Sequence, residues 1–217
     1  MNLTRASLIG SIVVAAALAF AAPVFAGPPL LCFPFETGGL KTLPMKGGDW
    51  KSVDPKYDVS HLKADTLALL TPTTPVVARM ETIRRATIYA STHPPSAADL
   101  LATLQARAAD KTTATAASAV FDFGYLVATY KQASFMFASP VKGLDAIDGY
   151  QLVLKAAALE SDPAMEFGAA VIAQGSANAA RRAESREHLD RALAGAKHDA
   201  ALAASVTKHF RTTGELR

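Results

Sequence analysis

The segment TATAASAVFDFGYLVATYKQASF, residues 113–135, has almost no polar face when it is drawn as a helix. Apolar or small side chains occupy nearly every position from Ala116 to Tyr130. A helix of this kind has to be covered on all sides, so we expect it at the centre of a helical body. The alternative is a membrane-spanning helix. It is disfavoured because Asp122 lies within the apolar run and Lys131 ends it.

Helical patterns also follow and precede this segment. Ser60, Ser96 and Asp162 are expected as N-caps, and Gly195 and Gly214 as left-handed C-terminal caps. No stretch alternates apolar and polar residues for long enough to predict a sheet. Over residues 58–217 we therefore predict an all-α domain of about eight short helices, stacked as antiparallel α-hairpins in a bundle or short α-solenoid. The expected helices cover about 60–70, 76–91, 96–109, 113–135, 147–160, 163–175, 181–194 and 197–211.

Residues 27–57 have the composition of an irregular arm. Repeated prolines remove backbone donors and paired glycines favour turns, so no helix is expected there. Leucines, phenylalanines and Trp50 make the arm too apolar for a solvated linker. We expect it to lie along the helical body with its aromatic residues docked; the alternative is a flexible tail.

Residues 1–26 have the pattern of a signal peptide. Arg5 supplies a positive charge, an apolar run of 15 residues follows from Leu8 to Ala22, and Val24-Phe25-Ala26 offers small residues at the cleavage positions. The alternatives are a retained membrane anchor, for which the run is short, and a lipid anchor on Cys32, which Leu31 disfavours. We predict a periplasmic or secreted protein without a stable membrane span after cleavage.

Charge and cysteine content exclude several classes of protein. The formal net charge falls from +3 to +2 when Arg5 is removed with the leader, which is too low for a typical nucleic-acid-binding surface. Cys32 is the single cysteine, so no internal disulfide can form. Cys32 is expected to be a small apolar residue of the arm; pairing between chains is the alternative.

Motifs for catalysis, cofactors or metals are missing or incomplete. There is no phosphate-binding loop, no dinucleotide glycine pattern and no Gly-x-Ser-x-Gly elbow, and the histidines do not have zinc-site spacing. Ser60 and Lys63 have the Ser-x-x-Lys spacing of penicillin-binding proteins, but the companion motifs of those enzymes are missing. We expect no cofactor and no metal, and the sequence favours a non-catalytic role.

Three charged residues are expected to face the interior. Arg84 lies between apolar residues of its helix, Asp122 between Phe121 and Phe123, and Glu166 beside Phe167. A buried ion has to be paired, so we predict that Arg84 pairs with Asp122 or with Glu166. The alternative is a polar pocket in which Arg84, Asp122 and Glu166 bind a ligand.

Two stretches resemble known kinds of protein. AESREHLDRALAGA, residues 183–196, resembles the second helix of a tetratricopeptide repeat, with small and medium apolar residues at matching positions. The arm CFPFETGGLKTLP resembles that of uncharacterised exported bacterial proteins, which implies no activity. Stacked hairpins expose grooves, so we expect a scaffold or interaction module that binds another envelope protein. The alternative is an envelope enzyme or small-ligand-binding protein that uses the Arg/Asp/Glu cluster.

Overall fold

The computed structural model describes residues 27–110, 116–137 and 141–212, so the expected signal peptide and Gly214 lie outside the described residues. Within these ranges the chain folds into helices and no strand, which confirms the all-α prediction. In the described ranges, no helix has both the length and the apolar character needed to cross a bilayer. The helices are α1 Pro29–Cys32, α2 Leu62–Leu69, α3 Val76–Ala90, α4 Pro94–Ala109, α5 Ala116–Phe137, α6 Gly149–Leu159, α7 Pro163–Gln174, α8 Ala179–Gly195 and α9 Ala200–Thr212, with the 3-10 turns η1 Val59–His61 and η2 Ala196–His198.

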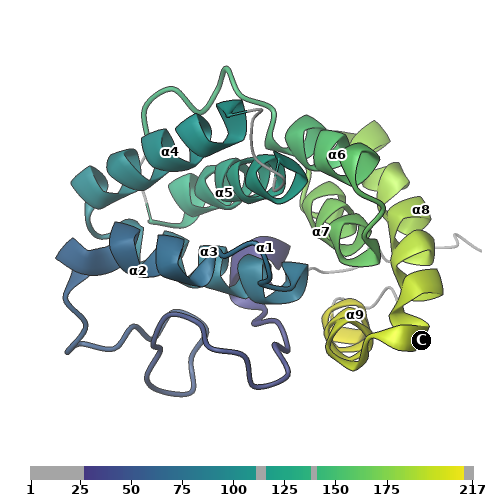
Figure 1. Cartoon of the computed structure of the whole chain (residues 1–217), viewed down its shortest axis with the longest axis horizontal. Coiled ribbons are helices and arrows are strands. Elements are labelled where there is room, and N and C mark those ends of the chain that lie inside the picture. Colours follow the sequence, from purple (N-terminus) through teal and green to yellow (C-terminus); the bar gives the residue numbers. More distant parts are fainter. Residues whose placement is uncertain (1–26, 111–115, 138–140, 213–217) are drawn as a thin grey trace, which may run out of the picture.

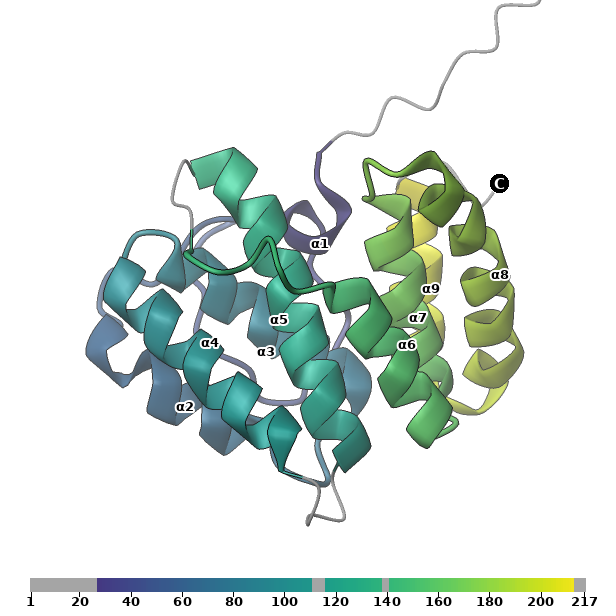
Figure 2. The same ribbon diagram turned by 90° about the horizontal axis from the view of Figure 1, so that it is seen from above.

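Helix α5 lies at the centre of the molecule, as its apolar sequence predicts. It packs against α1, α3, α4, α6 and α7, with α4 above it and α3 below it in Figure 1. Every residue from Ala119 to Tyr130 is buried. Viewed from above, α2 to α5 form one group of helices and α6 to α9 a second group beside it (Figure 2). The two groups are joined by contacts of α5 with α6 and α7 and of α3 with α7 and α9.

Two glycines allow α5 and α6 to approach each other closely. A Cβ on Gly149 would overlap the carbonyl oxygen of Gly124 and lie 2.9 Å from the Ala128 nitrogen. A Cβ on Gly124 would lie 2.8 Å from the carbonyl oxygen of Gly149. The helix backbones therefore touch at this crossing, and any larger residue would separate them.

Helix α7 begins as the sequence predicts, whereas α2 and α4 begin elsewhere. Asp162 caps α7 and accepts a hydrogen bond from the Ala164 nitrogen at 2.7 Å. The predictions of Ser60 and Ser96 as N-caps are wrong. Asp58 caps η1, which leads into α2, and His93 caps α4. Prolines occupy the first turn of α4 because they need no backbone donor there, so this helix starts at the prolines and not after them.

Gly195 does not have the left-handed conformation expected of it. Its φ is −84° and its ψ is −23°, so the backbone remains right-handed as α8 passes into η2. A Cβ at this position would overlap the ring of Pro163 at the start of α7. The glycine is therefore required by the close approach of two helices and not by a turn.

The arm follows the helical body over α2 and α3 (Figure 1). Leu30, Leu31, Phe35 and Leu43 are buried in the same core clusters as the helices. The expectation that the arm holds no helix is wrong at one place, because Pro29–Cys32 form the single turn α1. Proline suits the first turn of a helix, which explains why its presence did not prevent this one.

Aromatic residues of the arm dock around His209 of α9. Phe35 stacks on the imidazole at a centroid distance of 5.7 Å, and Phe33 meets it edge-on at 5.6 Å. Phe167 of α7 contacts both Phe35 and His209. The Nε2 atom of His209 lies 3.2 Å from Gln174 Oε1, where a neutral imidazole donates the hydrogen bond. Burial lowers the pKa of His209 from 6.5 to about 3, so the ring is uncharged at neutral pH.

We predict that this histidine makes the protein less stable as the pH falls. Below about pH 6.5 the unfolded chain binds a proton on His209 that the folded chain does not bind until about pH 3. The free energy of unfolding should fall by about 2 kcal/mol between pH 7 and pH 5 from this group alone. Urea unfolding of the wild type and of His209→Phe at both pH values isolates the effect, because other titrating groups are common to both proteins. Equal pH slopes for the two proteins would contradict the prediction.

Candidate functional site

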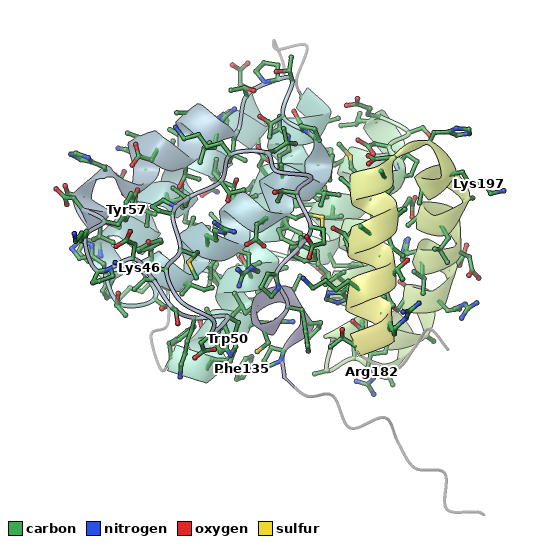
Figure 3. All side chains as sticks on the ribbon, turned by 90° about the horizontal axis from the view of Figure 1, so that it is seen from below. Lys46, Trp50, Tyr57, Phe135, Arg182 and Lys197 are labelled. Carbon is green, nitrogen blue, oxygen red and sulfur yellow. The ribbon has the colours of Figure 1, made fainter. Side chains whose placement is uncertain are left out.

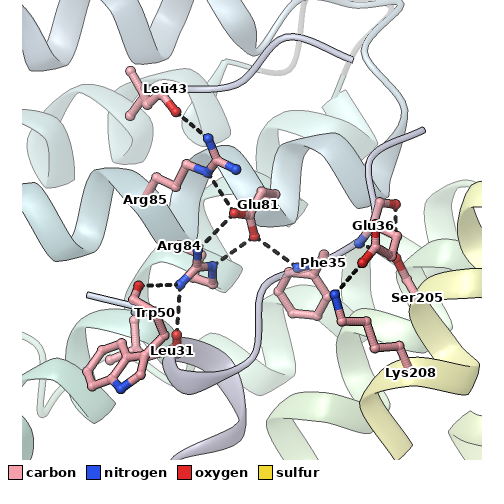
Figure 4. A network of polar contacts seen from close by, with 10 residues as sticks. All are labelled: Leu31, Phe35, Glu36, Leu43, Trp50, Glu81, Arg84, Arg85, Ser205 and Lys208. Carbon is pink, nitrogen blue, oxygen red and sulfur yellow. Dashed lines mark hydrogen bonds and ion pairs between the residues drawn. The ribbon is translucent and has the colours of Figure 1, made fainter. Parts of the chain in front are cut away.

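Arg84 is buried as expected, but its carboxylate partner belongs to its own helix. Its Nε and Nη2 atoms donate to Glu81 at 2.8 Å each, and Arg85 donates to the same carboxylate at 2.6 Å (Figure 4). The side chain of Glu81 has no exposed surface. Burial alone would raise the pKa of Glu81, but the hydrogen bonds and charges of Arg84 and Arg85 outweigh it and leave this pKa lowered.

This charged cluster holds the arm on α3. The Nη1 atom of Arg84 donates to the carbonyl oxygens of Leu31 at 2.8 Å and Trp50 at 3.1 Å. Glu81 accepts a hydrogen bond from the backbone N–H of Phe35 at 3.0 Å. Arg85 Nη1 donates to the carbonyl oxygen of Leu43 at 2.6 Å. The cluster therefore binds backbone groups at four separate points of the arm (Figure 4).

Asp122 pairs with Arg79 and not with Arg84. The Nη1 atom of Arg79 lies 2.7 Å from Asp122 Oδ2, and Arg79 also donates to the carbonyl oxygens of Thr71 and Thr74. Burial raises the pKa of Asp122 to about 6, although the charge and hydrogen bond of Arg79 oppose this. The pair joins the beginning of α3 to α5 and is closed to solvent, with side-chain exposures of 2% and 1%.

Glu166 belongs to a third network, between α6, α7 and α8. Its Oε2 atom lies 2.7 Å from His188 Nδ1 and 2.9 Å from Arg191 Nε. The other nitrogen of His188 lies 2.7 Å from the hydroxyl of Tyr150, which donates to Glu184 at 2.6 Å. Both imidazole nitrogens of His188 contact protein groups, Glu166 on one side and Tyr150 on the other. The network therefore connects three helices.

The structure does not bring Arg84, Asp122 and Glu166 together, and the predicted pairings of Arg84 are wrong. Periodicity identified Arg84 as buried, but it could not reveal that the arm covers a second face of α3. That cover is also why Glu81 is buried. The spacing of Glu81, Arg84 and Arg85 over three and four residues is a pattern of helical ion pairs and was the available signal.

An open groove lies elsewhere, where α1, the end of α5 and the α7–α8 connection meet. It has a volume of about 590 Å³. Phe135 of α5 stands in its wall with 90% of its surface exposed. Figure 3 shows Phe135 and Arg182 along one edge of the molecule, with α1 between them. Gln132 of α5 also lines the groove. The remaining lining residues come from the start of the arm and from the end of α7 and the connection after it, namely Gly27, Pro28, Pro29, Gln174, Gly175, Ser176 and Ala177.

Close packing beneath the groove fixes the relative positions of its walls. Gln132 of α5 accepts a hydrogen bond from the Leu30 nitrogen of α1 at 3.0 Å. A Cβ on Gly175 would overlap Gln132 Nε2 and lie 2.7 Å from Pro29 Cγ. Helix α5, the arm and the end of α7 thus meet at one point, and docking of the arm is part of what forms the groove.

A smaller pocket of about 180 Å³ adjoins the groove toward α6 and shares Phe135 and Gln132 with it. Lys131, Asp148, Tyr150 and Arg181 give this pocket its polar side. Arg181 lies 2.7 Å from Asp148 and 4.6 Å from the centre of the Tyr150 ring. We call the two together the α5–α8 groove.

The α5–α8 groove combines an apolar surface with a polar side. Its described lining residues include no histidine or cysteine. No group of three or more His, Cys, Asp or Glu side chains in the described ranges could hold a metal ion. An exposed aromatic side chain above a concave apolar surface is typical of a site for another protein.

Comparisons with protein-family models, curated proteins and solved structures gave no significant match.

We predict that Glu81→Gln destabilises the protein by about 3–5 kcal/mol, because it leaves buried guanidinium groups without their carboxylate. Urea unfolding measures the loss, and hydrogen exchange should show the amide of Phe35 becoming less protected. Asp190→Asn is the matched control, since it removes an exposed ion pair with Arg186 and should change stability by less than about 0.5 kcal/mol. Equal effects of the two substitutions would contradict the assignment.

Proposed function

We propose that this chain is a non-catalytic bacterial protein, exported to the periplasm or secreted, that binds a segment of another envelope protein in the α5–α8 groove. The exposure of Phe135 is the observation that carries the proposal. This side chain is 90% exposed although α5 is the central helix and is buried from Ala119 to Tyr130. Covering an aromatic ring with a partner removes a large apolar surface from water, and such rings dominate the affinity of many interfaces.

The surroundings of Phe135 support a protein partner over a small molecule. The groove is open and bounded by a hairpin, α7–α8, whose second helix has the tetratricopeptide-like spacing. Ser185 Oγ of that helix donates to the carbonyl oxygen of Ala170 at 3.0 Å, which holds the hairpin together. Hairpins of this kind commonly present surfaces to peptides and helices.

The alternative proposal was an enzyme or ligand-binding protein that uses Arg84, Asp122 and Glu166. These residues lie in three separate networks, and none of them lines the α5–α8 groove. We therefore base the proposed function on the groove and not on these charges.

Export supplies the first test. We expect the protein recovered from the periplasm or medium to begin at Gly27, and Ala26→Arg to leave the precursor uncut, because the peptidase requires a small residue at that position. Intact-mass measurement distinguishes the two products. Phe25→Arg is the control, since the middle residue of the cleavage motif is not read, and this variant should be processed normally. Recovery of the uncut wild-type chain would contradict export by signal cleavage.

Photo-crosslinking tests the groove. With p-benzoyl-phenylalanine in place of Phe135, we expect one discrete cross-linked product in the cell envelope, because a bound partner lies against this side chain. The same residue in place of Leu159, which is 58% exposed on α6 and outside the groove, is the control and should give no such product. Gel electrophoresis and mass spectrometry identify the partner. Indistinguishable products from both positions, or none from position 135, would contradict the proposed site.

A further inference from the structure

Some of the positive charges around the α5–α8 groove have no carboxylate partner in the part of the chain that the structure describes. Lys131 of α5 and Arg182 of α8 are both cationic, and neither forms an ion pair with another described residue. Lys131 Nζ donates to the carbonyl oxygen of Ile147 at 2.6 Å. Arg182 Nη1 donates to the carbonyl oxygens of Ser176 and Ala177 at 2.7 and 2.8 Å. Carbonyl oxygens bind these groups without neutralising their charge.

Asp148 is the single carboxylate among the described residues that line the groove, and it is already engaged. Its Oδ1 atom caps α6 by accepting from the nitrogens of Tyr150 and Gln151. Its Oδ2 atom pairs with Arg181. Although burial raises it, the pKa of Asp148 is lowered overall by the Arg181 hydrogen bond, so the carboxylate remains ionised. The lining therefore has an excess of positive charge.

Two arginines of the groove also lie at the positive end of a helix dipole. Arg181 and Arg182 lie in the first turn of α8, where the helix dipole disfavours cations. Both cations therefore interact unfavourably with the amino-terminal end of α8. A bound anion beside them would relieve the repulsion, because it interacts favourably with both the guanidinium groups and the helix.

We propose that the partner segment carries an acidic side chain, Asp or Glu, which enters the polar pocket beside Lys131 and Arg181 while a neighbouring apolar residue packs on Phe135. This inference rests on the proposed function and specifies the chemistry of the partner. The polar pocket and the apolar groove share Phe135, so one short segment can reach both. Charge complementarity sets the specificity and Phe135 supplies the apolar contact.

An anionic membrane carries negative charge as an acidic peptide does, but its shape does not fit the groove. A bilayer is flat and meets protruding side chains, whereas the excess charge here faces a concave surface between α5, α6 and α8. A peptide can enter such a surface and a lipid headgroup layer cannot. The structure thus favours a peptide segment, and membrane binding becomes one outcome of the test.

A random-peptide display library selected on the purified protein tests the inference. The peptides are displayed through their C-termini, so any selected carboxylate belongs to a side chain. We expect enriched sequences to combine an aromatic or aliphatic residue with Asp or Glu at a constant spacing. Replacing that acidic residue with its amide should weaken binding to the wild type by about fivefold. With Lys131→Gln, the acidic peptide and its amide variant should bind with equal affinity, because the two changes remove the same charge pair.

Lys197→Gln is the control, because Lys197 is exposed and lies far from Phe135 in Figure 3. It should preserve the fivefold preference. If Lys131→Gln fails to fold, Arg182→Gln takes its place as the groove variant. It should reduce the preference for the acidic peptide.

The outcomes separate the two proposals. Enrichment that depends on Phe135 but shows no preference for acidic residues overturns this inference and leaves the proposed function standing. If no peptide is enriched, or if the enrichment persists with Phe135→Asp, both proposals are overturned. Binding to phosphatidylglycerol vesicles that Phe135→Asp abolishes, without any selected peptide, also overturns both and assigns the surface to a membrane.

Discussion

Glu81 is a buried carboxylate of α3 that accepts hydrogen bonds from Arg84, from Arg85 and from the backbone of the arm. An irregular arm has backbone donors and acceptors that cannot be buried without partners. Glu81, Arg84 and Arg85 supply those partners at four points, and the arm can then cover α3 with its leucines and Phe35. Two guanidinium groups around one carboxylate also limit the cost of burying the charges themselves.

The docked arm also helps to form the groove. Helix α1 is the start of the arm, and its Leu30 nitrogen is held by Gln132 of α5. Pro29 packs against the end of α7 at Gly175, where a larger residue would not fit. The same segment therefore closes one side of the core and forms one wall of the surface that we propose binds a partner.

Much of the helical architecture could be predicted from the sequence because it depends on local patterns. The apolar run from Ala116 to Tyr130 indicated the central helix, and Asp162 followed by proline indicated the start of α7. The start of α4 differs from the expected N-cap at Ser96 because the ring geometry of the prolines before it suits the first turn of a helix. The sequence pattern does not identify Phe135 or the Glu81 cluster. The exposure of Phe135 and the covering of Glu81 by the arm both depend on segments that are distant in the chain.

The all-α class, the buried position of α5 and the burial of Arg84 follow from the amino-acid sequence, because helix periodicity reports how one segment distributes its apolar side chains. Which charges meet follows from the packing of the folded chain. Arg79 reaches Asp122, Arg84 reaches Glu81, and Glu166 reaches His188, according to how the arm and helices are packed. Pairing and exposure depend on distances of a few ångströms between segments far apart in the chain, and periodicity within one segment contains no information about those distances.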